Sequence, residues 1–107
     1  MVAAIRRVHV KAGQMNEVRR RVEQGLIPII SQIPGFVCYH AVDAGEDVAI
    51  SVTLYQDRAA ADAAIKAARP WAEANLVHLM GATEATVGEV VVSCTGITTR
   101  IDRVPAS

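Results

Sequence analysis

The sequence contains few aromatic residues, few cysteines and no long apolar stretch. Aromatic side chains make up only 4% of its 107 residues, so the core is built mainly from Ala, Val and Ile. No apolar run approaches the roughly 18 residues that a membrane-spanning helix needs, so we expect no membrane association of that kind. The two cysteines, Cys38 and Cys94, form no metal-binding or disulfide spacing motif and predict a reduced, cytoplasmic protein.

The charges of the sequence cancel, with eleven basic and eleven acidic residues. The one basic cluster, residues 19–21, is flanked by Glu17 and Glu23, so it offers little uncompensated charge to phosphates. This pattern predicts that the protein does not bind nucleic acid. The amino end places Arg6 and Arg7 inside a short apolar run, an order that a signal peptide does not have.

The sequence also lacks the motifs of most cofactor and metal sites. His9, His40 and His78 are scattered along the chain without metal-ligand spacing. There is no glycine-rich phosphate loop, dinucleotide fingerprint or nucleophile elbow. We therefore expect neither a cofactor nor a metal ion.

Alternation of apolar and polar residues predicts four strands. They cover residues 2–11, 36–42, 48–55 and 87–93. The polar residues 43–47 lie between the second and third strands and have the length of a hairpin turn. The second and third strands are therefore expected to pair as antiparallel neighbours.

Two segments instead show the apolar period of a helix. Residues 15–33 form the first, in which Gly25 and Pro28 predict a kink because proline lacks a backbone donor. Asp57 is a suitable N-cap for the second, which runs to Arg69. A restarted helix over residues 71–80 follows, and the next strand comes after it.

The order strand, helix, strand, strand, helix, strand is typical of the ferredoxin-like βαββαβ fold, an α+β architecture. In this fold a four-stranded antiparallel sheet carries both helices on one face. We expect one such domain over residues 1–93. Residues 94–107 form a tail that is expected to add a short strand.

The other face of the predicted sheet has no cover within one chain. Apolar residues make up 51% of the sequence, a large share for so small a domain, so we expect this face to close against a second copy in a homodimer. Tyr39 and His40 point to opposite faces of their strand, so only one of them can face the helices. The residues assigned to the uncovered face are Ile5, Arg7, His9, Ala49, Ser51, Thr53 and Tyr55.

Four motifs, in this order, give the sequence a resemblance to a known family. It resembles the antibiotic-biosynthesis-monooxygenase-like domains of the dimeric α/β-barrel superfamily over about residues 3–93. The motifs are Val-Lys-Ala-Gly at residues 10–13, Ile-Pro-Gly-Phe at 33–36, Leu-Tyr-Gln-Asp at 54–57 and Val-Gly-Glu-Val-Val-Val at 87–92. The resemblance implies a homodimer in which each subunit has a pocket between its sheet and its helices.

Similar proteins include cofactor-independent oxygenases of aromatic polyketides, haem-degrading enzymes, quinol oxygenases and domains without known chemistry. The haem-degrading members use an Asn on the first strand, a Trp early in the second helix and a His further on. Here Arg6, Ile65 and Asn75 stand at or near these positions. His78 lies one turn away and could replace the missing His only if the helix is reset, so we expect no haem degradation.

Trp71, Asn75 and His78 share one face of the predicted helix and could line the pocket. An indole can stack on a planar substrate, and a histidine that titrates near neutrality can act as a general base. The alternative interpretation is structural, with Trp71 anchoring the helix and His78 capping the core or facing solvent. Both interpretations stay open at this point.

Arg6 shares the helix-facing side of the first strand with Val8 and Val10. A guanidinium there must find a carboxylate, backbone carbonyls or a ligand anion, because an unpaired buried charge is costly. Glu73 or Glu89 could be that carboxylate. A ligand role, in which Arg6 stabilises an enolate or phenolate, is the alternative.

The resulting hypothesis is a homodimeric, cofactor-independent monooxygenase for small, planar aromatic or phenolic molecules. In the mechanism that the resemblance implies, the substrate is deprotonated and its anion reduces dioxygen. His78 is then the base, Arg6 and Trp71 stabilise the anion, and Asn75 orients the substrate. A non-catalytic binding or accessory domain of the same fold is the main alternative, and an isomerase or cyclase is a third possibility.

Overall fold

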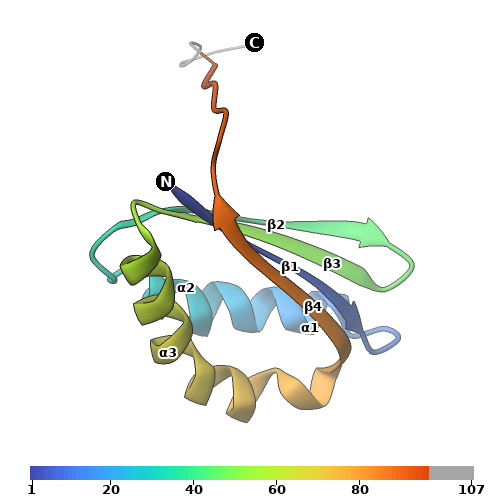
Figure 1. Cartoon of the computed structure of the whole chain (residues 1–107). Helices are drawn as coiled ribbons and strands as arrows, with labels where there is room; N and C mark the ends of the chain where they lie inside the picture. Colours follow the sequence, from blue (N-terminus) through green and yellow to red (C-terminus); the bar gives the residue numbers. More distant parts are fainter. Residues whose placement is uncertain (97–107) are drawn as a thin grey trace.

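The computed structural model describes residues 1–96 of the chain (Figure 1). The elements follow one another in the order strand, helix, strand, strand, helix, strand, as predicted. They are β1 (Val2–Val10), α1 (Met15–Arg21), η1 (Val22–Leu26), α2 (Ile27–Ile30), β2 (Phe36–Gly45), β3 (Val48–Tyr55), α3 (Arg58–Asn75), η2 (Val77–Leu79) and β4 (Met80–Glu89).

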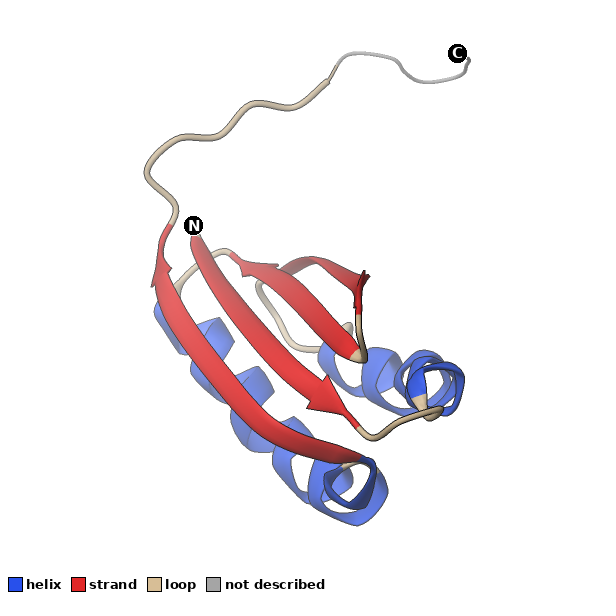
Figure 2. Ribbon diagram, turned by 90° about the vertical axis from the view of Figure 1, so that its right-hand side faces the viewer, coloured by secondary structure: helices blue, strands red, loops and turns tan. Residues whose placement is uncertain are grey.

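The four strands form one antiparallel sheet in the order β2-β3-β1-β4. The helices of residues 1–96 all lie on the same side of this sheet, and the other side carries none of them (Figures 1 and 2). The predicted ferredoxin-like α+β fold is therefore confirmed. No helix within residues 1–96 combines the length and the apolar character needed to cross a bilayer.

The first helical segment is continuous from α1 through η1 to α2, and η1 is a π-helical turn. The backbone N–H of Ile27 donates to the carbonyl of Val22, five residues back, in place of the usual four. The irregularity lies beside Gly25 and Pro28, where the sequence predicted a kink. One extra residue is thus accommodated in the middle of the helix.

The hairpin between β2 and β3 turns more tightly than predicted. Both Glu46 and Asp47 have positive φ angles, 55° and 62°, as the two central residues of a type I′ turn require. The side chain of Asp43 accepts a hydrogen bond from the Gly45 backbone N–H at 3.0 Å. Because the turn needs only two residues, β2 continues to Gly45 and does not end at residue 42.

The second helix differs from the prediction at its carboxyl end. Asp57 caps it as expected, accepting from the Ala60 N–H at 2.8 Å. However, α3 continues through Pro70 to Asn75 without a restart. Proline removes one backbone hydrogen bond there, while packing of Trp71 and Leu76 against the rest of the core holds the turns on either side together.

The last strand begins and ends earlier than predicted, at Met80–Glu89 in place of residues 87–93. It can pair only along the length of its neighbour β1, and Val2 already lies opposite Glu89. Val90 adds one backbone bond to Met1, at 2.8 Å. Beyond it Val91 and Val92, which are 88% and 86% exposed, have no strand to join within the described residues 1–96.

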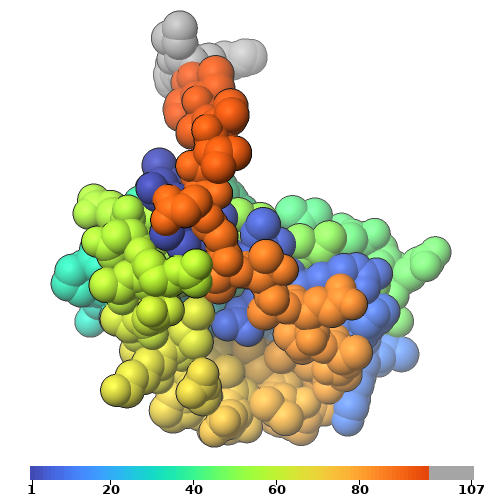
Figure 3. Space-filling view, in the orientation of Figure 1, coloured from blue at the N-terminus to red at the C-terminus, as the bar shows by residue number. Residues whose placement is uncertain are grey.

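The segment after β4 stands out from the body of the protein (Figure 3). Residues 90–96 contain no regular secondary structure. The short strand predicted for the tail, on Ile-Thr-Thr-Arg-Ile at residues 97–101, lies outside the described part of the chain.

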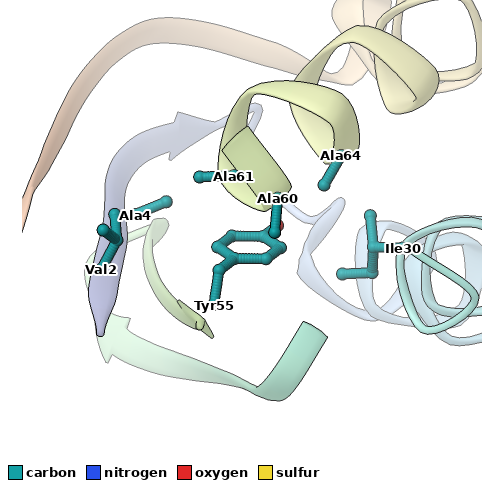
Figure 4. Close-up of a cluster of buried hydrophobic side chains, with 7 residues drawn as sticks. All are labelled: Val2, Ala4, Ile30, Tyr55, Ala60, Ala61 and Ala64. Carbon is teal, nitrogen blue, oxygen red and sulfur yellow. The ribbon is translucent and has the colours of Figure 1, made fainter. Parts of the chain in front are cut away.

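The core consists of two clusters between the sheet and the helices. In the first, the Tyr55 ring, which is 3% exposed, lies beneath the first turns of α3 beside Ala60, and Ile30 points from α2 toward Ala64 (Figure 4). The second cluster contains Val10, Val18, Leu76 and Leu79, with Trp71 packed against it. Members of both clusters line the space that remains between the sheet and the helices.

Candidate functional site

A cavity of about 440 Å³ lies between the sheet and the two helices. Its floor comes from the helix-facing side of β1, β2 and β3. Its walls are mostly aliphatic side chains of the first helical segment and of α3. The wall residues include Val18, Val22, Leu26, Ile27, Ile30, Ala64, Ile65 and Ala68.

Polar side chains gather on the floor because the strand register places them side by side. Arg6 on β1 lies opposite Ser51 on β3, and Thr53 on β3 lies opposite Tyr39 on β2. Tyr55 follows Thr53 by two residues and so shares its face. All five line the cavity, and we call them the polar cluster.

The electrostatics of the polar cluster favour neutral phenols beside a fixed cation. Burial raises the pKa of the Tyr39 phenol, and the Ser51 hydroxyl and the Arg6 charge oppose part of that rise. Burial likewise raises the pKa of Tyr55, opposed by the Thr53 hydroxyl and by Arg6. Both phenols are therefore protonated at neutral pH and available as hydrogen-bond donors.

Arg6 forms no ion pair with any carboxylate in residues 1–96. Neither Glu73 nor Glu89 takes the partner role considered for them: both are exposed, and Glu89 lies opposite Val2 at the far end of β1. Two other carboxylates, Glu23 and Asp43, belong to the cavity lining, and both are exposed to solvent. The half-buried guanidinium therefore faces the cavity without a protein counter-ion in the described chain.

The other three predicted site residues do not line this cavity. Trp71 packs on Gly25 in the π turn, and together with Asn75 it lines a separate, more open hollow between the helices. The Asn75 amide donates to the Trp71 carbonyl at 2.9 Å, within its own helix. His78 is exposed on η2, with its Nε2 3.4 Å from an Arg21 nitrogen.

The expectation that Arg6, Trp71, Asn75 and His78 border one pocket is thus wrong in its geometry. The face of α3 that meets the sheet and the cavity is made of alanines and Ile65, whereas Trp71 turns toward the first helix. The structural interpretation of Trp71, a packing anchor, agrees with its position. Only Arg6 of the four faces the large cavity.

The separate hollow lined by Arg20, Arg21, Gln24, Gly25, Trp71 and Asn75 is called the outer hollow. Its two arginines, unlike Arg6, already form hydrogen bonds with protein groups. Arg21 donates to Glu17 at 2.6 Å and to the Asn75 carbonyl at 2.7 Å, which joins α1 to the end of α3. Arg20 also bonds to Glu17 and reaches Gln24 at 3.2 Å. These bonds to Arg20 and Arg21 lower the pKa of Glu17 to about 2.

Three members of the polar cluster lie on the face opposite to the one predicted for them. Ser51, Thr53 and Tyr55 were expected on the uncovered face, but the pairing with β1 turns them toward the helices. Alternation separates two faces without showing which one is inward, and on β3 the more apolar set faces outward, contrary to the prediction. His9 does lie on the uncovered face, and Tyr39, not His40, faces the helices.

The residues of the cavity and of the rest of the described chain offer little to a metal. No group of three His, Cys, Asp or Glu side chains in residues 1–96 is arranged to hold a metal ion. All three histidines of the sequence lie in this part of the chain, and none lines the cavity. An iron-bound group such as haem would therefore find no imidazole ligand in the cavity.

The fold is similar to solved structures of several small proteins. A protein of unknown function from Nitrosomonas europaea has a TM-score of 0.75 at 18% identity, covering 89% of this chain and 93% of that one. SnoaB, a cofactor-independent oxygenase from Streptomyces nogalater, has a TM-score of 0.69 at 14% identity, covering 86% of this chain and 94% of that one. The haem degrader MhuD from Mycobacterium tuberculosis has a TM-score of 0.67 at 22% identity, covering 89% of this chain and 100% of that one. At such identities the likeness establishes the fold alone.

No match to the sequence is found among curated proteins. A family profile does match: residues 1–69, more than half of the chain, fit the profile of antibiotic biosynthesis monooxygenases. The matched segment contains the whole polar cluster and most of the cavity wall. The chain therefore belongs to the antibiotic biosynthesis monooxygenase family.

Proposed function

We propose that the protein is a cofactor-independent monooxygenase that binds a small, planar phenol or enol in the cavity. The observation that carries the proposal is Arg6, a cation without a protein counter-ion in residues 1–96 that faces a largely aliphatic cavity. Two protonated phenols, Tyr39 and Tyr55, lie beside it. A flat apolar molecule with one acidic oxygen matches this surface in shape and in charge.

In the proposed reaction the protein stabilises the substrate as an anion. Arg6 and the two phenols favour the enolate or phenolate oxygen, so an activated C–H or O–H loses its proton more readily. The electron-rich carbon then gives one electron to dioxygen, and the radical and superoxide combine to a peroxide. Protonation of the peroxide and loss of water convert a CH₂ group and O₂ into a C=O group and H₂O, which balances.

The proton acceptor in this proposal is a carboxylate and not His78. His78 cannot reach a ligand in the cavity from its exposed position on η2. The carboxylates that line the cavity are Glu23 and Asp43, and they replace His78 as candidates for the base. Glu23→Gln and Asp43→Asn identify the base by which of them slows turnover while the substrate still binds.

We also propose that two copies pair through the uncovered face of the sheet. This face presents apolar side chains to solvent, including Ile5, which is 42% exposed, and Val52 and Leu54, which are half-buried. An uncovered sheet face with exposed apolar side chains suits a two-fold interface. Sedimentation as a monomer at micromolar concentration would contradict it.

A non-catalytic binding protein of the same fold is the second candidate. The absence of a histidine from the cavity lining favours it, since the lining then lacks a base that titrates near neutrality. Such a protein would bind the same planar phenols without consuming oxygen. Haem degradation is not proposed, because the cavity lining contains no histidine to ligate iron.

Oxygen uptake with a panel of anthrones, quinols and flavonoid-like phenols tests the enzymatic proposal. We expect uptake by the wild type and by Arg7→Leu, whose side chain lies on the opposite face of β1, and little uptake by Arg6→Leu. Binding measured in parallel by calorimetry separates the two candidates. Tight binding of an anthrone with no oxygen uptake would favour the binding protein, and equal uptake by Arg6→Leu would overturn the role of Arg6.

A further inference from the structure

The π turn decides which side chains of the first helix face the cavity. In an uninterrupted α-helix, Gly25 and Ile29 would share the face of Val18, two and three turns further on. Because the π turn contains one extra residue, Leu26 and Ile30 occupy those positions instead. Leu26 and Ile30 line the cavity, Ile30 being only 4% exposed, whereas Gly25 and Ile29 do not line it.

Trp71 occupies the space outside this turn. A side chain at residue 25 would overlap the indole ring at Cζ2, Cε2 and Nε1, so only glycine allows this contact. The indole itself is held in place, because Trp71 packs against the second core cluster and Arg21 joins the end of α3 to α1. Rotating Gly25 inward would leave these indole atoms without their partner.

We propose that Trp71 is a positioning residue that fixes the register of the cavity wall. By holding Gly25 outward it keeps Leu26 and Ile30 inward, and so it limits the size of the ligand without touching it. Pro28 is compatible with the turn but does not enforce it, because it has no N–H to lose from an α-helical bond to the carbonyl of Gln24. Among the helix geometries that accommodate a proline, the packing of Trp71 then favours the π turn.

The size effect follows from the side chains that would change places. In the α-helical register Gly25 would stand where Leu26 now projects, so the wall would recede at that point. Loss of the indole should therefore shift the cavity toward larger ligands. The effect on ligand size rests on the proposed binding of planar phenols, whereas the effect on the helix register does not.

Methyl NMR tests the register directly and needs no ligand. In the wild type we expect nuclear Overhauser contacts from Ile30 to the Tyr55 ring, which are in the same cluster, and none from Ile29. In Trp71→Ala we expect Ile29 to gain these contacts and Ile30 to lose them. Glu73→Ala, at an exposed position of the same helix, is the control and should keep the wild-type pattern.

Two further variants keep the test decisive if Trp71→Ala fails to fold. Trp71→Phe retains an aromatic ring for the core but lacks the indole atoms nearest Gly25, and it should give a mixture of both registers. Pro28→Ala should keep the wild-type contacts, since the indole remains in place. A folded Trp71 variant with unchanged Ile30 contacts, or a register shift in Pro28→Ala alone, would overturn the proposal.

Ligand size preference gives the functional measure. The ratio of dissociation constants for anthrone and para-nitrophenol should fall in Trp71→Ala by about tenfold, the discrimination expected for one or two methylene-sized contacts. An unchanged ratio in a variant whose register has shifted would contradict the specificity role. If the wild type binds neither probe, the proposed function fails while the NMR result still decides the register.

Discussion

The two hollows of this protein both contain arginine, yet the arginines are in opposite situations. In the outer hollow, Arg20 and Arg21 are bonded to Glu17, and Arg21 also to a backbone carbonyl. In the cavity, Arg6 has no carboxylate partner in residues 1–96 and lies beside two phenols. An arginine whose bonds are satisfied within the chain stabilises the fold, whereas one left facing a cavity is available to a ligand.

The largest expected effect of a single substitution is on ligand binding by Arg6→Leu. A hydrogen bond to a charged group contributes about 1.5–3 kcal/mol, so affinity for a planar phenolate should fall by roughly 10- to 100-fold. Calorimetry with para-nitrophenol at a pH above its own pKa measures this. The matched variant Arg7→Leu, on the opposite face, should bind as the wild type does; an equal loss in both would remove the distinction between the two arginines.

Gly25→Ala should destabilise the fold although alanine is the better helix former by about 1 kcal/mol. The added methyl group overlaps the indole of Trp71, and overpacking of this kind costs about 1–3 kcal/mol. Denaturant unfolding measures the change in the free energy of unfolding. In the Trp71→Ala background the same substitution should instead be neutral or stabilising, and a similar loss in both backgrounds would count against the contact.

Arg21→Gln should lower stability and leave the cavity unaffected. It removes the bond to the Asn75 carbonyl that joins the two helices, which contributes about 1 kcal/mol. Thermal unfolding and para-nitrophenol binding, measured on the same sample, separate the two effects. Weakened binding without a change in stability would place Arg21 in the ligand site and would contradict its structural role.

Tyr39→Phe should weaken phenolate binding by a few-fold, since a neutral hydrogen bond contributes about 0.5–1.5 kcal/mol. Because burial raises the pKa of Tyr39 above 10.0, its donor should persist as the pH rises past that value. The contribution of the neutral Tyr39 phenol to the free energy of unfolding is complete below pH 10 and is lost as the pH rises through the higher pKa of the folded protein. Binding that declines already between pH 8 and about 9 would contradict the raised pKa.

The smallest expected effect is the response of the outer hollow to acid. The pKa of Glu17 falls from 4.5 to about 2 in the folded protein. The carboxylate therefore stabilises the fold above pH 4.5, and this contribution is lost as the pH falls toward 2. Exposure to solvent screens the pair, so the effect should be slight. Glu17→Gln should flatten the acid side of the stability profile; a profile identical to the wild type would show the pair to be inert.

The sequence predicted the order of elements because each depends on local patterns. The period of apolar residues, the Asp57 cap and the disturbance near Pro28 all appear as expected. The extent of β4 did not follow from its own residues, because it is set by where β1 begins. Val90–Val92 look like strand and have no partner strand in residues 1–96 beyond the bond from Val90 to Met1.

The site was predicted less well, for reasons of register. Arg6 was placed correctly because the first strand alternates clearly and its buried residues are aliphatic. Tyr55 was assigned to the wrong face because on β3 the outward side is the more apolar one. Trp71 was assigned to the pocket because the π turn, which brings Gly25 outward to meet it, has no simple periodic signal. In each failure a contact between distant segments decides the outcome.

The ionisation of bound para-nitrophenol tests the central claim most directly. The phenolate absorbs visible light, so its pKa can be measured by titration in the cavity and in free solution. We predict that the wild type and Arg7→Leu lower the pKa of the bound phenol by about one unit or more, and that Arg6→Leu does not. A bound pKa that is the same in the wild type and in Arg6→Leu would contradict the account, since the cavity would then hold its ligand without stabilising an anion.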